Sequence, residues 1–264
     1  MAGQADGRGL VRVVSLACSN TEIVCALGCA DLLVGVDDHS DFPDAVVSAL
    51  PRVGPDLEVD IGAVADLEPD LVLASLTVPG HERVVAGLEE AGLEFLALEP
   101  VSLEDIYADI REVARTLGVP ERGAALVGEM KSQLVDRGLP KARPRVVVQW
   151  WNRPTIAPGA LSWVTDLLGL VGAENPIGRE PVKSRLVSDD ELAYLDPDAI
   201  ILSWCGVRPE KYRPAVVAQN PAWRQVRAVK RGHIYCVPEA YLGRPGPRLV
   251  EGYRALHGIV ETLG

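Results

Sequence analysis

Three cysteines near the N-terminus are the residues whose type and spacing come nearest to a metal-cluster site. Cys18, Cys25 and Cys29 could supply three thiolates to an iron–sulfur cluster, which would make the chain an oxidoreductase. However, Cys25 and Cys29 are one helical turn apart among the apolar residues 23–27, a pattern typical of small thiols buried in a helix core. We therefore expect structural thiols, and a cluster enzyme remains the alternative from another functional class.

The histidines point to a ligand at only one position. His39 lies in the polar loop after a predicted strand at residues 32–36, where the carboxyl ends of strands in open α/β sheets bind ligands. We predict that His39 faces a ligand, with axial ligation of a bound metal as a less favoured role. His81 and His257 fall in helical stretches and are expected to be exposed, whereas His233 begins a strand.

The tryptophans are a stronger sign of binding, because all of them lie in the second half of the chain: Trp150, Trp151, Trp163, Trp204 and Trp223. Trp150 and Trp151 end one predicted strand and Trp204 ends another, at the same edge of a parallel sheet. Indoles there offer flat apolar contact with a polar tip, which suits a large, flat, amide-fringed ligand. Neighbours on a strand face opposite ways, so only one of Trp150 and Trp151 can face a given surface. Trp163 and Trp223 are expected in the core or at its rim.

A loop at residues 240–248 is stiffened by two prolines and two glycines. Its projecting side chains are Tyr241, Leu242, Arg244 and Arg248. A rigid loop at a helix start can present donors to an anion or an amide. An ordinary turn into the last helix explains the same pattern equally well.

Composition excludes several functional classes. A net charge of −11 without any basic run argues against nucleic-acid binding. No apolar run approaches the roughly 20 residues that span a bilayer. The first ten residues contain no apolar signal segment, and the odd number of cysteines forms no disulfide framework. We expect a cytoplasmic protein from the sequence as written, and an extracytoplasmic one if a natural leader has been removed.

Enzyme signatures are missing as well. The sequence contains no G-x-S-x-G elbow, no phosphate-binding G-x-x-x-x-G-K-[ST] loop and no H-E-x-x-H motif. We therefore predict that the chain is not an enzyme and requires no cofactor.

An internal repeat indicates how these residues are positioned. Residues 64–75 are similar to residues 192–203, with the matches Leu67/Leu195, Pro69/Pro197, Asp70/Asp198 and Ser75/Ser203. The repeated unit reads as a short helix, a Pro-Asp turn and an apolar strand. Strands alternate with helices elsewhere, which predicts an α/β fold in which each lobe has a mainly parallel sheet flanked by helices. We place the lobes at residues 10–118 and 143–264, joined by a long helix and a proline-bounded joint at 119–142, with the ligand in the inter-lobe cleft.

Several segments together resemble the cobalamin-binding members of the helical-backbone metal receptor family, the substrate-binding proteins of cobalamin and iron-siderophore ABC importers. The segments are residues 13–22, 36–43, 67–72, 151–154, 195–198, 205–206 and 240–248. The resemblance covers about residues 11–262. It implies two α/β lobes joined by one long helix, the class III substrate-binding fold, and non-catalytic capture of cobalamin or a related corrinoid.

The resemblance, together with the residue patterns, gives one set of candidate ligand contacts: Ser19, Asn20, His39, Ser75, Trp151, Trp204, Cys205, Gly206, Tyr241 and Arg244. Relatives dock to a permease through one acidic residue on each lobe. The second-lobe position is Asp190, and the first-lobe equivalent is Gly62. A tyrosine-type aromatic of the relatives is replaced at His39.

The sequence is also compatible with a different cargo. A ferric siderophore or haem would need cationic partners, and the second half offers Arg153, Arg179, Arg185, Arg208 and Arg244.

Overall fold

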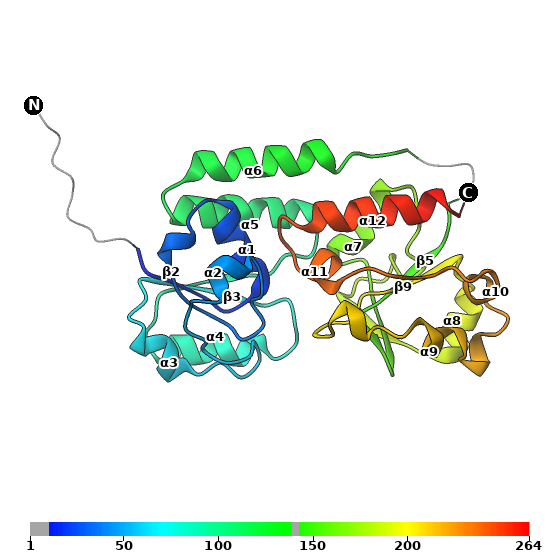
Figure 1. Ribbon diagram of the computed structural model, residues 1–264, viewed down its shortest axis with the longest axis horizontal. Helices are drawn as coiled ribbons and strands as arrows, with labels where there is room; N and C mark the ends of the chain where they lie inside the picture. The colour runs from blue at the N-terminus through cyan, green and yellow to red at the C-terminus, as the bar shows by residue number, and fades with distance from the viewer. Residues whose placement is uncertain (1–10, 139–142, 264) are drawn as a thin grey trace, which may run out of the picture. The chain divides into compact units, whose positions relative to one another are not determined.

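The computed structural model describes residues 11–138 and 143–263 (Figure 1). The N-terminal ten residues, part of the predicted joint at 139–142 and the last residue lie outside the described residues. The chain divides into two compact units. Unit 1 comprises the residues up to Glu99 together with Asp109–Leu126, and unit 2 comprises Pro100–Ala108 and the residues from Val127 on.

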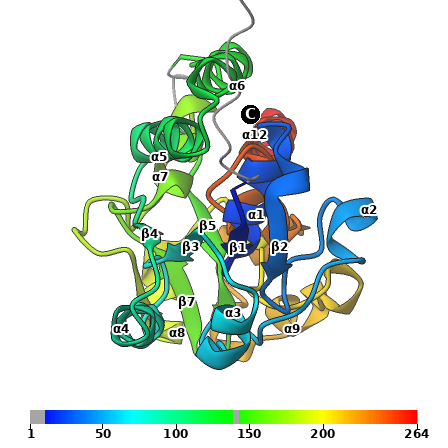
Figure 2. The same cartoon turned by 90° about the vertical axis from the view of Figure 1, so that its left-hand side faces the viewer.

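Unit 1 is built on a parallel sheet with the strand order β2-β1-β3-β4. Its strands are β1 (Val13–Ser15), β2 (Leu33–Val36), β3 (Leu71–Ser75) and β4 (Phe95–Leu98). Its helices are α1 (Cys18–Ala26), the short α2 (Asp44–Val47), α3 (Ile61–Asp66) and α4 (His81–Glu90). Figure 2 shows α3 and α4 on one side of this sheet, where Val64 and Leu88 pack against strand residues Val14 and Val72.

Unit 2 contains a parallel sheet and a separate antiparallel one. The parallel sheet has the order β10-β9-β5, from β5 (Val146–Gln149), β9 (Ala199–Leu202) and β10 (Ile234–Cys236). The antiparallel sheet has the order β6-β7-β8, from β6 (Trp151–Asn152), β7 (Thr155–Pro158) and β8 (Ser184–Val187). The helices are α7 (Trp163–Leu170), α8 (Asp189–Leu195), α9 (Pro214–Ala218), α10 (Arg227–Arg231), α11 (Glu239–Leu242) and α12 (Leu249–Glu261).

Two further helices contribute to both units. They are α5 (Leu103–Thr116) and α6 (Pro120–Gln133). Helix α6 begins in unit 1 and ends in unit 2. The predicted α/β class with mainly parallel sheets is thus confirmed, whereas the antiparallel sheet of unit 2 was not anticipated.

The internal repeat corresponds to the same local structure in both units. The Asp70 carboxylate accepts the backbone N–H of Arg12 at 2.7 Å, and the Asp198 carboxylate accepts that of Arg145 at 2.9 Å. In return, the backbone N–H groups of Asp70 and Asp198 donate to the carbonyl oxygens of the same two arginines. Each Pro-Asp turn therefore places the strand that follows it, β3 or β9, beside the first strand of its unit.

Each repeat also ends its helix in the same strained way. Glu68 and Asp196 have φ angles of 46° and 43°, and they are the non-glycine residues with positive φ among the residues described. A left-handed residue stops a helix because it turns the chain away from the helix axis. The proline that follows each of them then sets the direction of the turn.

Candidate functional site

A row of apolar side chains, exposed at its two ends and half-buried in the middle, crosses the antiparallel sheet of unit 2. Trp151 pairs with Ile156 on β7, and Ile156 pairs with Leu186 on β8. Residues directly opposite one another on neighbouring strands project from the same face, so the three side chains lie side by side. Trp151 is 43% exposed and Leu186 59% exposed, and apolar side chains that lie together in this way are typical of an interaction surface. We call this row the apolar platform.

The opposite face of the same sheet is anchored to the protein. Val187 and Ala157 are buried there in the core of unit 2. Arg185, on the same edge strand, is held by Glu180 at 2.5 Å and by Glu191 at 2.5 Å, and the two carboxylates keep the pKa of its guanidinium above the ordinary value. Because its neighbours on β8 are fixed inward, Leu186 must project outward.

One end of the apolar platform borders a cavity. Trp151 and Trp204 line a hollow of about 310 Å³ together with Val207, Asn152 and Arg153. Trp204 is only 8% exposed, and its ring stands 5.5 Å from that of Tyr212. The structure therefore brings together the two tryptophans that the sequence placed at one sheet edge. The other predicted tryptophans, Trp163 and Trp223, are buried, as expected.

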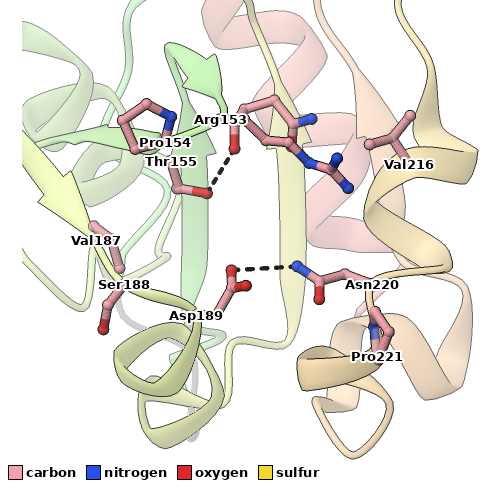
Figure 3. A pocket seen from close by; sticks show the side chains of 10 residues that line it. Arg153, Pro154, Thr155, Val187, Ser188, Asp189, Val216, Asn220 and Pro221 are labelled. Atoms are coloured by element: carbon pink, nitrogen blue, oxygen red, sulfur yellow. Dashed lines mark hydrogen bonds between the residues drawn. The ribbon is translucent and has the colours of Figure 1, made fainter.

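A second, larger cavity lies on the other side of the hairpin tip (Figure 3). It measures about 440 Å³ and is bounded by the tip, the start of α8 and the segment around α9. Its lining residues are Asn152, Arg153, Pro154, Thr155, Val187, Ser188, Asp189, Val216, Asn220 and Pro221. Across it, the Asn220 amide donates to the Asp189 carboxylate at 3.2 Å.

The remaining candidates of unit 2 lie outside both linings. Cys205 and Gly206 are exposed in the turn after Trp204, where Gly206 has a φ of 67° that favours glycine. Tyr241 is half-buried, and the Arg248 guanidinium lies 5.3 Å from its ring centre. Arg244 is paired with Glu239 at 3.3 Å.

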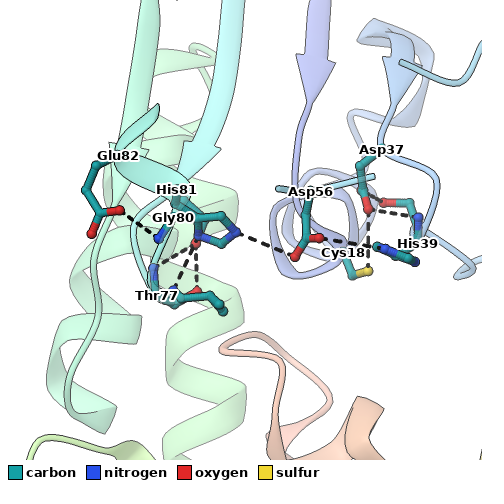
Figure 4. Close-up of polar contacts among 11 residues, drawn as sticks. Cys18, Asp37, His39, Asp56, Thr77, Gly80, His81 and Glu82 are labelled. Atoms are coloured by element: carbon teal, nitrogen blue, oxygen red, sulfur yellow. Dashed lines mark hydrogen bonds and ion pairs between the residues drawn. The ribbon is translucent and has the colours of Figure 1, made fainter. Parts of the chain in front are cut away.

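In unit 1, the loops after β2 and β3 carry a cluster of charged side chains (Figure 4). The Asp56 carboxylate stands between two histidines, 3.7 Å from His39 Nε2 and 3.5 Å from His81 Nε2. The His39 side chain is 53% exposed, so it is accessible to a ligand. The buried Asp37 carboxylate accepts the backbone N–H of His39 at 2.9 Å. Burial raises the pKa of Asp37, while a hydrogen bond from Ser40 opposes the shift.

The expectation of an exposed His81 is wrong, because this side chain is 4% exposed. Its Nδ1 accepts the backbone N–H of Val78 at 3.4 Å, which leaves Nε2 as the protonated nitrogen facing Asp56. The interaction with His81 lowers the pKa of the Asp56 carboxyl. His81 thus fixes the loop before α4 to the loop that contains Asp56.

Replacing Asp56 with asparagine is expected to lower the free energy of unfolding at pH 7 by about 1 kcal/mol, a modest value because solvent screens this carboxylate. A carboxyl whose pKa is depressed in the folded state stabilises the fold above its unfolded pKa and loses that contribution as the pH falls through the folded value. The gap between wild type and D56N should therefore be complete at pH 7 and shrink below pH 3.8. Urea denaturation of both proteins, at pH 7 and at a pH below 3.8, measures this difference in the free energy of unfolding. An equal difference under the two conditions would contradict the assignment.

Three other candidates of unit 1 are largely buried. Ser19 and Asn20 lie in α1 with exposures of 6% and 2%, and the Asn20 amide donates to the carbonyl of Ala74 at 3.0 Å. Ser75 ends β3 and its hydroxyl lies 2.9 Å from that of Thr77. Asn20 thus joins α1 to β3, and Ser75 joins the end of β3 to the loop that follows it.

The cysteines near the N-terminus do not converge. Cys18 donates to Asp37 across 3.9 Å, whereas Cys29 is buried and contacts the carbonyl of Leu27. Burial raises the pKa of the Cys25 thiol to about 11, so this group stays protonated at neutral pH. No set of three or more potential metal-ligating side chains is found in residues 11–138 and 143–263.

The predicted docking residue Asp190 is exposed in the first turn of α8. Ser188 caps α8 and Asp60 caps α3, each accepting a backbone N–H three residues further on. Gly62 therefore occupies in α3 the place that Asp190 occupies in α8, two residues after the cap. The two units differ in charge at this position.

Two residues of the apolar platform, Ile156 and Leu186, were missed from the sequence. Leu186 pairs with Ile156 across the long segment between β7 and β8, and no local pattern specifies this pairing. The sequence signal available was the Asn-Arg-Pro turn between Trp151 and Thr155, which is typical of a hairpin.

Residues 13–241 match the family described as periplasmic binding protein. An ABC transporter substrate-binding lipoprotein of Bacillus subtilis (strain 168) is 29% identical over 254 residues, covering 93% of this chain and 78% of the relative. A vitamin B12-binding protein of Vibrio vulnificus (strain YJ016) is 26% identical over 246 residues, covering 90% of this chain and 85% of the relative.

A solved structure gives the same fold. The periplasmic haem-binding protein of Roseiflexus sp. RS-1, in its apo form, superposes with a TM-score of 0.81 at 23% identity, over 97% of this chain and 99% of that one. At this identity the likeness is one of fold. In the described residues, every helix is too short or too polar to cross a bilayer. The names of these proteins, a lipoprotein and a periplasmic protein among them, do not support the cytoplasmic location expected from the sequence.

Proposed function

Because the chain belongs to the periplasmic binding protein family, we propose that it captures cobalamin or a related corrinoid and releases it unchanged to an ABC permease. The apolar platform is the observation that carries this proposal. Trp151, Ile156 and Leu186 form a flat apolar surface that suits the face of a macrocycle, and Trp204 closes one end of it. The curated relative that binds vitamin B12 supports the same cargo.

Affinity on such a surface comes mainly from apolar area removed from water, at about 25 cal/mol per Å². An exposed indole loses little conformational freedom on binding, because it has only two rotatable side-chain bonds. Protein groups orient the ligand without making or breaking a bond, so the proposed role is non-catalytic. The ligand is the cargo of the protein and no resident cofactor is required.

The other predicted contacts remain part of the proposal. His39 is exposed and could approach the metal of a bound corrinoid as an axial ligand. The exposed turn of Cys205 and Gly206 follows Trp204 directly and offers backbone groups to ligand amides. The further proposed contacts are Ser19, Asn20, Ser75, Tyr241 and Arg244. Asp190 is proposed to meet a basic side chain of the permease.

Two of the five arginines that could meet an anionic chelate are already paired, which favours a corrinoid over a ferric siderophore or haem, whereas Arg153 has no carboxylate partner among the described residues. Arg185 is neutralised by Glu180 and Glu191, and Arg244 by Glu239. An anionic chelate would gain little from cations that already have carboxylate partners.

The test is direct binding. Purified protein mixed with hydroxocobalamin should elute from gel filtration as a red complex at micromolar concentration. Competition by haem and by a ferric hydroxamate siderophore, followed through tryptophan quenching, ranks the cargoes. Elution of the red colour with free ligand alone would refute the proposal, and displacement of cobalamin by a lower concentration of haem would replace it with the haem assignment.

A further inference from the structure

We propose that the larger cavity of unit 2 is a subsite for an anionic side arm of the ligand, with Arg153 as the counter-ion. The arm that fits best is a nucleotide tail attached through a phosphodiester. This inference rests on the proposed corrinoid-binding function and narrows it to corrinoids that carry such a tail.

The two cavities of unit 2 share a wall. Asn152 and Arg153, at the tip of the β6–β7 hairpin, line both of them. Trp151 projects from one face of the sheet, whereas Thr155 and Val187, which line the larger cavity, pair with each other in the next row and project from the opposite face. A ligand seated against Trp151 therefore lies one hairpin tip away from the larger cavity, and a flexible arm can pass over that tip.

Arg153 brings an uncompensated positive charge to this tip. Among the described residues that line the two cavities, Arg153 is the one with a positive charge. Its guanidinium forms no hydrogen bond or ion pair within residues 11–138 and 143–263. Arginine binds phosphate oxygens through a planar fork of N–H donors, and such charge-assisted bonds are about twice as strong as neutral ones. An anionic group at the tip would give Arg153 its missing partner.

The rest of the lining suits a nucleotide. The Asn152 amide and the exposed Ser188 hydroxyl can bond to a sugar and to base edges. The Thr155 hydroxyl already donates to the carbonyl of Asn152, and the Asn220 amide donates to Asp189. Val216, Pro154 and Pro221 give apolar surface for a flat ring. The Asp189 carboxylate, bonded to Asn220, repels an anion from its side of the cavity, so the phosphate belongs beside Arg153 (Figure 3).

Size separates a nucleotide tail from a smaller anionic arm. A volume of about 440 Å³ lies within the range of about 300–1,000 Å³ that holds a whole drug-sized ligand. A propionate, such as haem carries, would leave most of the cavity empty. A base, a ribose and a phosphodiester together would fill much more of the cavity.

The experiment compares two corrinoids that differ in the arm. Cyanocobalamin carries the nucleotide and dicyanocobinamide lacks it. We expect wild type to bind cyanocobalamin about tenfold more tightly than dicyanocobinamide, because one charge-assisted contact contributes roughly this difference in affinity. Arg153→Gln should reduce that preference to about twofold without weakening cobinamide, and Arg153→Lys should restore part of it. Arg224→Gln, an exposed arginine of unit 2 outside both linings, is the matched control and should change neither affinity.

A second variant tests the space and not the charge. Val216 is half-buried in the wall of the larger cavity, and Val216→Phe should weaken cyanocobalamin several-fold while leaving cobinamide unchanged. Equal binding of the two corrinoids by wild type, unaffected by R153Q and V216F, overturns the subsite but leaves the proposed function standing. No binding of either corrinoid overturns the proposed function itself. An equal loss of haem and cobalamin affinity in R153Q would keep the anion contact and overturn its assignment to a nucleotide tail.

Discussion

Replacing Trp151 with alanine should weaken binding of cyanocobalamin roughly 30-fold or more. A buried interface tryptophan typically contributes about 2 kcal/mol or more, and about 1.4 kcal/mol corresponds to a factor of ten in Kd. Trp151 belongs to both the apolar platform and the smaller cavity, so its removal takes apolar contact from both. Because the side chain is 43% exposed in the free protein, its loss should leave the fold intact. Isothermal titration calorimetry and a urea unfolding curve measure the two effects separately.

Substitutions at Leu186, another residue of the apolar platform, should have smaller or larger effects according to the side chain introduced. Leu186→Ala removes a smaller apolar side chain and should weaken binding about fivefold, in line with roughly 1 kcal/mol of lost burial. Leu186→Asp, which places a charge against the macrocycle, should weaken it more. Tyr194→Ala is the matched control, because Tyr194 is an aromatic of unit 2 that is 87% exposed and lines neither cavity. A Trp151→Ala protein that binds within twofold of wild type would show that the platform is not the ligand surface.

Replacing Gly252 with alanine should lower the free energy of unfolding by about 3 kcal/mol, near the upper end of the cost of overpacking a core. A Cβ atom at this position would stand 2.1 Å from the backbone oxygen of Tyr241 and 2.8 Å from a methyl carbon of Leu242. Backbone cannot rotate out of the way as a side chain can, so α11 and α12 would have to separate. Gly252 thus allows the close approach that holds the Tyr241 segment in place.

Gly258 supplies the control on the same helix. Among the described residues, no atom outside the helix lies within 4 Å of a Cβ added there, and alanine is the better helix former by about 1 kcal/mol, so Gly258→Ala should stabilise the protein slightly. Urea denaturation of the two variants against wild type gives the comparison. If Gly252→Ala changes the stability by less than about 0.5 kcal/mol, the size of an ordinary surface substitution, the close packing of α11 on α12 is not as described.

Much of the parallel-sheet framework was predictable, because its determinants are local. The strands at Val13–Ser15, Leu33–Val36 and Leu71–Ser75 are short apolar runs that end in polar loops. Asp70 and Asp198 accept N–H groups of distant residues, Arg12 and Arg145, but the Pro-Asp turns themselves can be recognised from adjacent residues. For the same reason the two halves could be recognised as versions of one unit.

The candidate site was predictable only in part. Trp151 and Trp204 were placed together because each follows a strand of one parallel sheet, and the carboxyl ends of such strands share an edge. Leu186 was not found, because its neighbours on the platform come from a distant hairpin. His81 was predicted to lie on the surface, because the sequence of a helix start does not indicate which segment packs against it. In the folded chain, the loop that carries Asp56 lies against His81.

The amino-acid sequence alone determined which segments form the strands of the parallel sheets, that the pattern occurs twice, and that indoles gather at one strand edge. Periodicity and turn chemistry act over a few residues and can be read without the fold. Tertiary structure alone decided which strands lie beside β7, that Arg153 has no carboxylate partner among the described residues, and which cavities share the hairpin tip. Those properties depend on contacts between residues far apart in the chain, and no local pattern records them.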